Sequence, residues 1–258
     1  MSEGARIAVH AKACTEALGL DHGLATIAEA GFEKVVLWAG ETGQWIERVR
    51  RCGALGLDVL AVAVPKVLGL AAGAPVVLGE WVARTQAAGA PAISLLFGDT
   101  METPCSAPRV DRLAAWLAAL GVPVLIENAG RPGERFSDPA MVARLLARVP
   151  GARPVLDLGH LATAGRAPAD AFTLASRAAW VEVHDNDAVH DLHLPLGAGE
   201  GRGSFQAGLS VLSPLPATIV IETNPRCEGE ARAWVSALRA DAARLRDFLS
   251  SLDEGANG

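Results

Sequence analysis

The sequence predicts an α/β protein with a single (β/α)₈ (TIM) barrel, and three observations favour this fold. Short apolar segments of strand length alternate with longer segments of helical periodicity along the whole chain. The length of 258 residues is typical of such a barrel, and a chain that is 50% hydrophobic can bury a sizeable core. The turn after the first strand, HAKACTEALG, lacks the glycine-rich phosphate loop that usually opens a doubly wound sheet, which is the rival fold.

Eight segments are expected to form the parallel strands of the barrel. Most are apolar nearly throughout, as expected for parallel strands that are covered on both faces. In chain order they are Arg6–His10, Lys34–Trp38, Asp58–Val64, Ala92–Phe97, Val122–Glu127, Arg153–Asp157, Trp180–His184 and Thr218–Glu222.

Helical periodicity is clearest in three of the segments that follow strands. They are Asp111–Leu120, Asp138–Val149 and Glu230–Leu252. The second has Ser137 as its expected N-cap and Pro139 at its first position. We expect one domain over residues 1–258, because no linker or low-complexity tract interrupts the pattern, with a frayed tail at Asp253–Gly258.

Composition excludes several classes of protein. No apolar run is long enough to span a membrane, and the first ten residues, MSEGARIAVH, do not resemble a signal peptide. The net charge of −6 argues against general affinity for nucleic acid. The four cysteines are far apart without a CxxC pair, which indicates buried thiols in a reducing compartment. We therefore expect a soluble, cytoplasmic protein.

Acidic and imidazole side chains lie where the later strands end, which is where the active site of such a barrel is found. They are Glu127 on the fifth strand, Asp157 and His160 at the sixth, Glu182 and His184 on the seventh, and Glu222 on the eighth. Alternation along a strand places Glu182 and His184 on the same face. Four inward carboxylates would repel each other, so a divalent cation is expected among them.

Simpler interpretations apply to some of these residues. A single acid at a strand end is more often a helix N-cap or a surface ion pair, but four on successive strands are hard to explain by capping alone. His22 is expected at the surface, and His190 in a loop without an assigned role. Lys66 is equally compatible with a solvated loop residue and a catalytic one.

The motifs LDLGH and HDNDAVHDLHLPLGAGEG, with Glu127 and the final VIE, resemble those of the xylose-isomerase-like TIM-barrel superfamily (AP endonuclease family 2). This group contains sugar and sugar-phosphate isomerases and epimerases, and the endonuclease IV type of abasic-site nuclease. The resemblance covers essentially the whole chain. It implies that Glu127, Asp157 and Glu222 bind metal, that Glu222 doubles as a base, and that His160 binds metal or substrate. It also implies metal binding by the DxH pair, Asp191 and His193.

The sequence departs from the family pattern in two places. The family usually has a metal-binding histidine on strand seven, three residues before an aspartate, and Glu182 occupies that place when counted from Asp185. Either Glu182 is the ligand or His184 replaces it. Nuclease-like relatives also use histidines after strands two and three or four, which are absent here, so a three-zinc nuclease site is not expected.

The candidate ligands indicate the kind of metal. Glu127, Asp157, Glu182 and Glu222 are hard oxygen donors that suit Mn²⁺ or Mg²⁺, whereas Zn²⁺ prefers more nitrogen or sulfur. We expect one or two divalent ions (Mn, Mg, Co or Zn) per chain. Either a second ion binds near Asp191 and His193, or one glutamate has a raised pKa and serves as a base.

The expected activity is that of a metal-dependent isomerase or epimerase acting on a small sugar-like or hydroxy-carbonyl substrate. Glu127 or Glu222 would remove the proton next to the carbonyl, the other would return it, and His160 would orient a hydroxyl. Trp38 is either an apolar wall of the site or barrel core. A dehydratase-type lyase using the same site is the alternative, and an endonuclease IV-like phosphodiesterase ranks below it. The expected partner is a small molecule, without nucleic acid or membrane, and the family resemblance allows a homo-oligomer.

Overall fold

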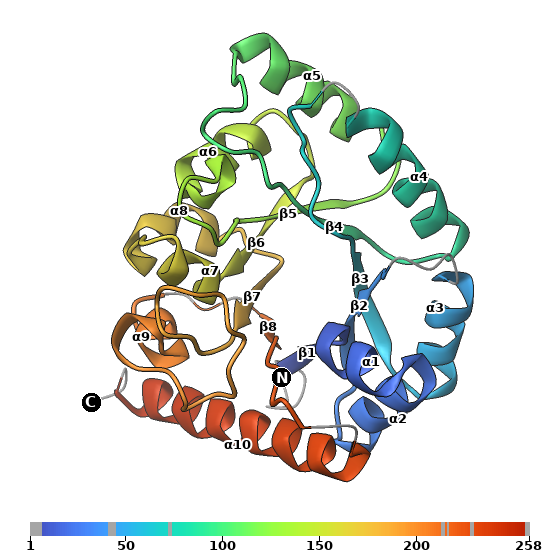
Figure 1. Cartoon of the computed structure of the whole chain (residues 1–258), viewed down its shortest axis with the longest axis vertical. Helices are drawn as coiled ribbons and strands as arrows, with labels where there is room; N and C mark the ends of the chain where they lie inside the picture. The colour runs from blue at the N-terminus through green and yellow to red at the C-terminus, as the bar shows by residue number, and fades with distance from the viewer. Residues whose placement is uncertain are drawn as a thin grey trace.

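The protein is a closed barrel of eight parallel strands surrounded by helices (Figure 1), as seen in a computed structural model that describes residues 7–40, 45–71, 74–212, 215, 217–227 and 230–255. The strands are β1 (Ile7–His10), β2 (Lys34–Trp38), β3 (Asp58–Ala63), β4 (Ile93–Leu96), β5 (Val124–Glu127), β6 (Arg153–Asp157), β7 (Trp180–Val183) and β8 (Ile219–Ile221). Each strand pairs with the next, and β1 pairs with β8 to close the sheet. The predicted (β/α)₈ barrel is confirmed, and each predicted strand lies within two residues of its observed limits.

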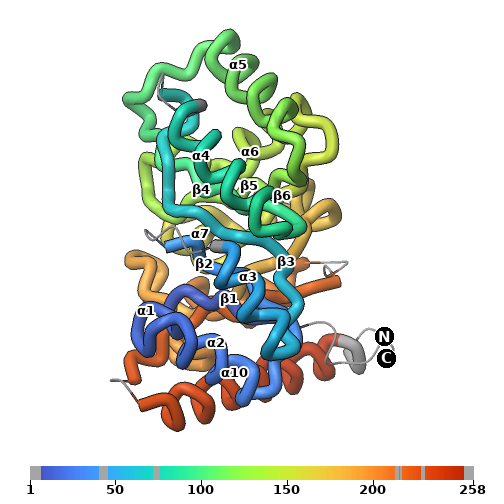
Figure 2. Tube along the Cα trace, turned by 90° about the vertical axis from the view of Figure 1, so that its right-hand side faces the viewer, coloured from blue at the N-terminus to red at the C-terminus, as the bar shows by residue number. Residues whose placement is uncertain are grey.

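The helices alternate with the strands and form the outer layer of the barrel. They are α1 (Lys12–Leu18), α2 (Leu20–Glu29), α3 (Trp45–Ala54), α4 (Ala74–Ala87), α5 (Ala107–Ala118), α6 (Pro139–Leu146), α7 (Leu158–Thr163), α8 (Phe172–Ala175), α9 (Phe205–Leu209) and α10 (Ala231–Gly255). Short 3₁₀ helices cover Arg135–Ser137, Pro168–Ala171 and Gly201–Gly203. The last helix lies beside α2 (Figure 2), where the Arg239 guanidinium donates to the carbonyl of Glu29 at 2.6 Å.

The expectation about the start of α6 was wrong. The N-cap of α6 is Asp138, whose Oδ1 accepts from the Ala140 N–H at 3.0 Å. Ser137 belongs to the preceding 3₁₀ helix, and its hydroxyl donates to the Glu134 carbonyl at 2.7 Å, so it is not available as a cap. At the other end of the chain α10 continues to Gly255, and residues 256–258 lie outside the described part, so the frayed tail at Asp253–Gly258 stays a prediction.

The barrel interior is a small apolar cluster that combines small and large side chains. It contains Ala8, Val36, Ala61, Ala63, Ala92, Leu125, Val155, Trp180 and Val220. The alanines on β1 and β3, with Ala92 just before β4, leave a volume that the indole of Trp180, 3% exposed, fills from β7. A larger apolar cluster lies between the strands and the surrounding helices and packs these two layers together. The floor beneath the site is therefore dry and densely packed.

Alternation along the strands carries polar side chains onto the same inward face, one layer above this cluster. Each lies two residues after a member of the interior cluster: His10, Trp38, Glu127, Asp157, Glu182 and Glu222. The C-terminal ends of parallel strands meet at one mouth of the barrel, so these side chains converge there.

Two further expectations can be compared with the structure. Within the described residues, no helix combines the length and the apolar character needed to cross a membrane. All four cysteines are free thiols, but only Cys14 and Cys52 are buried, whereas Cys105 and Cys227 are partly exposed, contrary to expectation.

Replacing Trp180 with alanine should lower the free energy of unfolding by about 3–5 kcal/mol, because a cavity would remain between alanines that cannot close it. Urea denaturation followed by far-UV circular dichroism measures the loss. Trp116→Ala on α5 is the matched control, and should cost less because that side chain is only partly buried. An equal effect of the two substitutions would contradict the packing role of Trp180.

Candidate metal centre

A cavity of about 470 Å³ opens at the mouth of the barrel. Its lining includes His10, Trp38, Lys66, Glu127, His160, Asp191, His193 and Glu222. Asp157, Glu182 and His184 lie beneath this lining and are almost completely buried. The structure thus brings together all eight residues singled out as site candidates from the sequence.

Three groups of side chains offer ligand atoms within 4.8 Å of one another: Glu127 with Asp157 and His160; Asp157 with Glu182 and Glu222; and His160 with Asp191 and His193. In the first group, His160 Nδ1 lies 3.0 Å from Glu127 Oε1 and 3.4 Å from Asp157 Oδ2. Asp157 and His160 each belong to two groups. The groups are therefore one continuous cluster that extends from the buried Asp157 and Glu182 up to the cavity.

Asp157 combines a structural and a ligand-like position. Its Oδ1 accepts the backbone N–H of His160 at 2.7 Å and caps the N-terminus of α7. The capping interpretation therefore holds for this residue, but only for one oxygen. The other oxygen, Oδ2, is buried and has no hydrogen-bond partner among the described residues.

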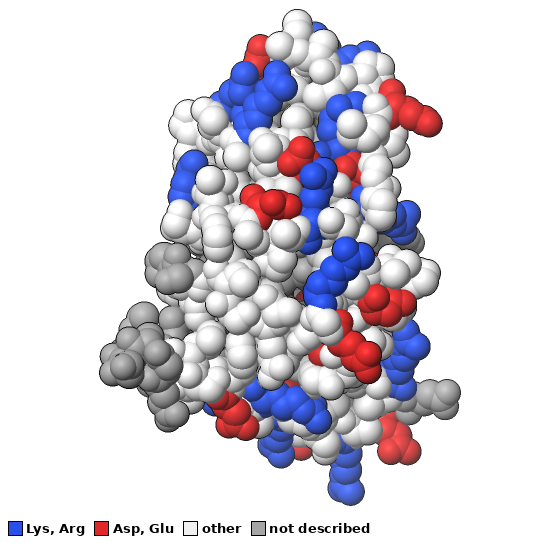
Figure 3. All heavy atoms as spheres, turned by 90° about the vertical axis from the view of Figure 1, so that its left-hand side faces the viewer, with Lys and Arg blue, Asp and Glu red and all other residues white. Residues whose placement is uncertain are grey.

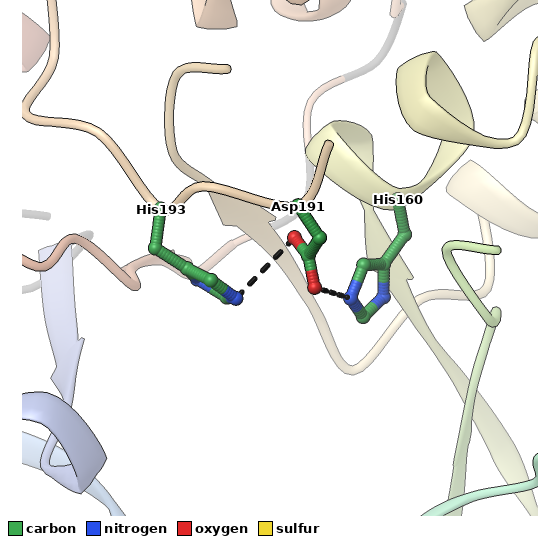
Figure 4. A group of neighbouring side chains, drawn as sticks. All are labelled: His160, Asp191 and His193. Carbon is green, nitrogen blue, oxygen red and sulfur yellow. Dashed lines mark hydrogen bonds and ion pairs between the residues drawn. The ribbon is translucent and has the colours of Figure 1, made fainter. Parts of the chain in front are cut away.

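The third group is arranged in the way that metal-binding histidines usually are (Figure 4). Nδ1 of His160 lies 2.9 Å from the carbonyl oxygen of Asn128, and Nδ1 of His193 lies 2.9 Å from that of Glu222. Nδ1 is then the protonated nitrogen in each ring, which leaves Nε2 free to act as a ligand. The two Nε2 atoms lie 3.2 and 3.3 Å from the oxygens of Asp191, between the rings.

His184 lies between the two ends of the cluster. Its Nε2 is 3.3 Å from Asp157 Oδ1 and 3.6 Å from Asp191 Oδ1, and its ring stacks on that of His193 at 4.2 Å. Among the described residues neither ring nitrogen has a hydrogen-bond partner of good geometry. Glu182 accepts a hydrogen bond from the indole of Trp180 at 2.8 Å, and its second oxygen has no hydrogen-bond partner in the part of the chain that the structure describes.

Histidines supply part of the positive charge that the sequence led us to expect from a divalent cation alone. Burial disfavours the charged form of His193, but Glu222 and Asp191 outweigh it and raise its pKa to about 9. Burial also disfavours the charged form of His160. The nearby Asp157 and Asp191 outweigh this effect and raise the pKa of His160 well above its usual value. Protonated imidazoles thus balance carboxylates where no metal is bound.

The carboxylates respond in opposite directions. Burial raises the pKa of Glu127 despite its hydrogen bond with His160. Burial also raises the pKa of Glu182 well above its usual range, and the charges of Glu127 and Glu222 act in the same direction. Burial opposes ionisation of Glu222, but His10 and His193 hold its pKa below the usual value. Similarly, His160 and His184 overcome burial and lower the pKa of Asp157 to about 2.

Two glycines leave room for the imidazoles. A Cβ at position 159 would lie 2.1 Å from the ring of His184, and one at position 130 would lie 2.3 Å from the ring of His160. Gly159 is part of the LDLGH motif. This motif therefore contains the candidate ligands Asp157 and His160 and also leaves space for the ring of His184. A side chain at either glycine would displace a candidate ligand.

Buried amide and carboxylate groups hold the surrounding backbone. The Asn128 side chain bonds both the N–H and the carbonyl of Asp157, each at 2.9 Å. Asp185 accepts the N–H groups of Gly197, Gly199 and Phe205 at 2.7–2.8 Å. Asp185 is therefore occupied with the loop after β7 and is not aimed at the cavity.

Several cavity residues were not assigned a role from the sequence. His10 lies 3.7 Å from Glu222 Oε1 and accepts the Lys12 N–H at 3.2 Å. Lys66 pairs with the buried Glu134 at 2.9 Å. His10 closes β1 and so belongs to the strand-end residues of the mouth, whereas the partner of Lys66 is 68 residues away and carries no local signal.

The remaining candidates fall where the simpler interpretations placed them. His22 is exposed. His190 is an exposed loop residue bonded to Asp187 at 2.8 Å, and it reaches the rim of the cavity. Trp38 lies on the cavity wall, with Lys12 Nζ 4.9 Å from the centre of its ring. It also packs against the interior cluster, so both interpretations of Trp38 apply.

The residues present fit a divalent cation. Asp157 Oδ2, Glu182 Oε2 and both ring nitrogens of His184 are buried without hydrogen-bond partners among the described residues. Leaving such groups unsatisfied is costly, and a cation bound among them would satisfy carboxylates and imidazoles together. Oxygen donors at the floor and imidazoles above are suitable ligands for first-row divalent ions.

The sequence profile of the xylose isomerase-like TIM barrel family matches residues 24–248. No curated protein gave a match.

Solved structures with the same fold include a D-tagatose 3-epimerase-like protein, with a TM-score of 0.74 and 15% identity over 97% of this chain and 99% of that one. The IOLI protein, solved with a bound zinc atom, has a TM-score of 0.75 and 12% identity over 96% and 99%. A probable 3-DHS dehydratase, AsbF from Bacillus anthracis, has a TM-score of 0.65 and 14% identity over 93% and 98%. Identities this low establish a shared fold, while the profile match establishes the family. The chain belongs to the xylose isomerase-like TIM barrel family.

Proposed function

We propose that this protein is a divalent-metal-dependent isomerase or epimerase of a small sugar-like or hydroxy-carbonyl substrate. One observation carries the proposal. Glu127, Asp157 and Glu222 converge with His160, His184 and His193 at and directly beneath a cavity of about 470 Å³. A cavity of this size suits a small molecule. The family and its similarity in fold to an epimerase-like protein support the same class of reaction.

Two positions for a cation are proposed. Asp157 shares one group of ligand atoms with Glu127 and another with Glu222, and His184 Nε2 lies 3.3 Å from Asp157, so these four residues would form an oxygen-rich floor site that suits Mn²⁺ or Mg²⁺. His160, Asp191 and His193 would form an upper site with two imidazoles, which suits Zn²⁺. The bound ion would supply stabilisation of the negative charge that develops on the substrate oxygen when the neighbouring carbon loses its proton.

Proton transfer is assigned to the two glutamates that border the cavity. The lowered pKa of Glu222 keeps it ionised, so it would accept the proton from the carbon next to the carbonyl. The raised pKa of Glu127 favours its protonated form, so it would return a proton. His160 lies 3.0 Å from Glu127 and on the cavity wall, where it would orient a substrate hydroxyl.

A dehydratase is the second candidate, because the same proton removal followed by loss of a neighbouring hydroxyl would eliminate water. Its support is the similarity in fold to the probable 3-DHS dehydratase. A nuclease has less support. Acidic and basic side chains are interspersed on the face over α6, α8 and α9 (Figure 3), and the net charge is −6.

The proposed activity predicts metal content and metal-dependent exchange. Purified protein should contain about one or two divalent ions per chain, and should incorporate solvent deuterium into a ketose or keto-acid. Elemental analysis and mass spectrometry of a substrate panel in D₂O measure both. Loss of water from the labelled product would identify the dehydratase instead of the isomerase.

The same measurements on Glu127→Ala, Asp157→Ala and Glu222→Ala should show reduced metal content and no exchange, with a folded barrel by circular dichroism. His22→Ala, at an exposed position, is the control. Full metal occupancy in the three carboxylate variants would contradict the floor site.

His184 is proposed as the strand-seven ligand in preference to Glu182. Among the described residues both ring nitrogens of His184 lack a hydrogen-bond partner, whereas one carboxylate oxygen of Glu182 already accepts the indole N–H of Trp180. His184→Gln should therefore lower Mn²⁺ affinity at least tenfold more than Glu182→Gln does, as measured by isothermal titration calorimetry. The opposite order would place Glu182 among the ligands.

Metal binding should become tighter with rising pH. At neutral pH the metal-free rings of His160 and His193 hold protons that a cation must displace, because their pKa values are raised. Affinity for Zn²⁺ should increase about tenfold per pH unit for each displaced proton, and the part due to His193 should level off near pH 9. Calorimetry from pH 6 to pH 9.5 tests this, with His193→Asn reducing the slope by about one proton. An affinity that no longer rises above pH 7 would contradict the raised pKa values.

A further inference from the structure

A buried carboxylate on α10, behind the site, has no part in the chemistry described above. Asp241 is 1% exposed and lies in the middle of that helix. Its Oδ1 accepts the backbone N–H of Leu196 at 3.0 Å, and its Oδ2 accepts the hydroxyl of Thr223 at 2.7 Å. The side chain of Arg244 lies 3.4 Å away on the exposed side. Asp241 thus joins the loop after β7 to the residue that follows Glu222.

The two segments joined by Asp241 each carry a candidate ligand, and they are tied at two more points. The carbonyl of His193 accepts the N–H of Asn224 at 2.6 Å. The ring of His193 donates from Nδ1 to the carbonyl of Glu222 at 2.9 Å. Asp241 adds a third connection between the two segments, at Leu196, three residues after His193.

His193 needs this attachment because its backbone is strained. Its φ of +49° lies in the left-handed region, which a residue with a Cβ adopts at a cost unless its surroundings hold it there. That backbone conformation directs Nε2 toward Asp191. Weaker restraint of the loop would let His193 relax and turn its ring away.

The two sides of the junction differ in how firmly they are held without Asp241. Glu222 donates its N–H to the Val183 carbonyl at 3.0 Å, directly after a strand that pairs on both sides. The loop side pairs with its neighbours only through an isolated bridge, in which the backbones of Leu194 and Asp185 exchange hydrogen bonds of 2.7 and 3.1 Å, and the side chain of Asp185 secures the loop from Gly197 onward. Loss of Asp241 should therefore move His193 more than it moves the carboxylates at the strand ends.

We propose that Asp241 is a positioning residue that holds His193 in its strained conformation and thereby sets the affinity of the upper cation site. The inference rests on the proposed function, since it concerns one of the two cation positions. Asp241 comes from α10, and none of the described residues of that helix lines the cavity. The inference predicts an effect on the site formed by His160, Asp191 and His193 without an effect on the floor site.

A double-mutant cycle on Zn²⁺ affinity, measured by isothermal titration calorimetry, tests the inference. Asp241→Ala and His193→Ala should each weaken the upper site about 10- to 100-fold, the range found when partners of metal ligands are removed. The double variant should lose little more than either single one, because Asp241 acts through His193. Thr223→Val, which removes only the hydroxyl, should give a smaller loss. Asp241→Asn should restore most of the affinity, because its amide can accept from Leu196 and donate to Thr223.

Asp138→Ala, which removes the N-cap of α6 elsewhere in the barrel, is the control and should leave Zn²⁺ binding unchanged. Additive losses in the cycle, equal weakening of both cation sites, or unchanged affinity in Asp241→Ala would overturn the inference while leaving the proposed function intact. Unchanged Zn²⁺ affinity in His193→Ala would also overturn the inference and leave the proposed function intact. Wild-type protein that binds no divalent ion would overturn the proposed function and the inference together.

Discussion

The desolvation of acidic side chains at one mouth of the barrel is the constraint on which the rest of the site depends. Glu127, Asp157, Glu182 and Glu222 arise from four neighbouring strands and are all largely buried. Burying several carboxylates together is unfavourable unless positive charge accompanies them. The protein meets this requirement in three ways: the pKa of His193 is raised, the pKa of Glu182 is raised, and the ligand atoms are grouped closely enough for a divalent cation.

The fold makes this arrangement tolerable by keeping its base rigid and its ligands restrained. Trp180 and the interior alanines close the barrel beneath the cluster, and the indole also bonds Glu182. Backbone carbonyls fix the tautomers of His160 and His193, while glycines 130 and 159 leave space for imidazole rings. The chemistry proposed for Glu222 and Glu127 follows from the different surroundings of two residues of the same type.

Much of the barrel and the strand-end part of the site were predictable from the sequence, for physical reasons. Apolar segments covered by helices mark the strands, and an acid that ends such a segment must face the mouth, as Glu127, Asp157 and Glu222 do. Alternation could not choose between Glu182 and His184, because both face inward and only their partners differ. Asp191 and His193 lie in a loop and were found through family resemblance. Asp241 could not be found, since its partner Leu196 is 45 residues away.

The most direct test of the account is a crystal structure of the protein soaked with Mn²⁺ or Zn²⁺, with the ions located by anomalous scattering. The account predicts an ion bound by Glu127, Asp157, Glu222 and His184, and a second between His160, Asp191 and His193. Anomalous peaks only at the protein surface, with hydrogen bonds or water satisfying the buried carboxylates, would show that the acidic cluster is balanced by its histidines alone.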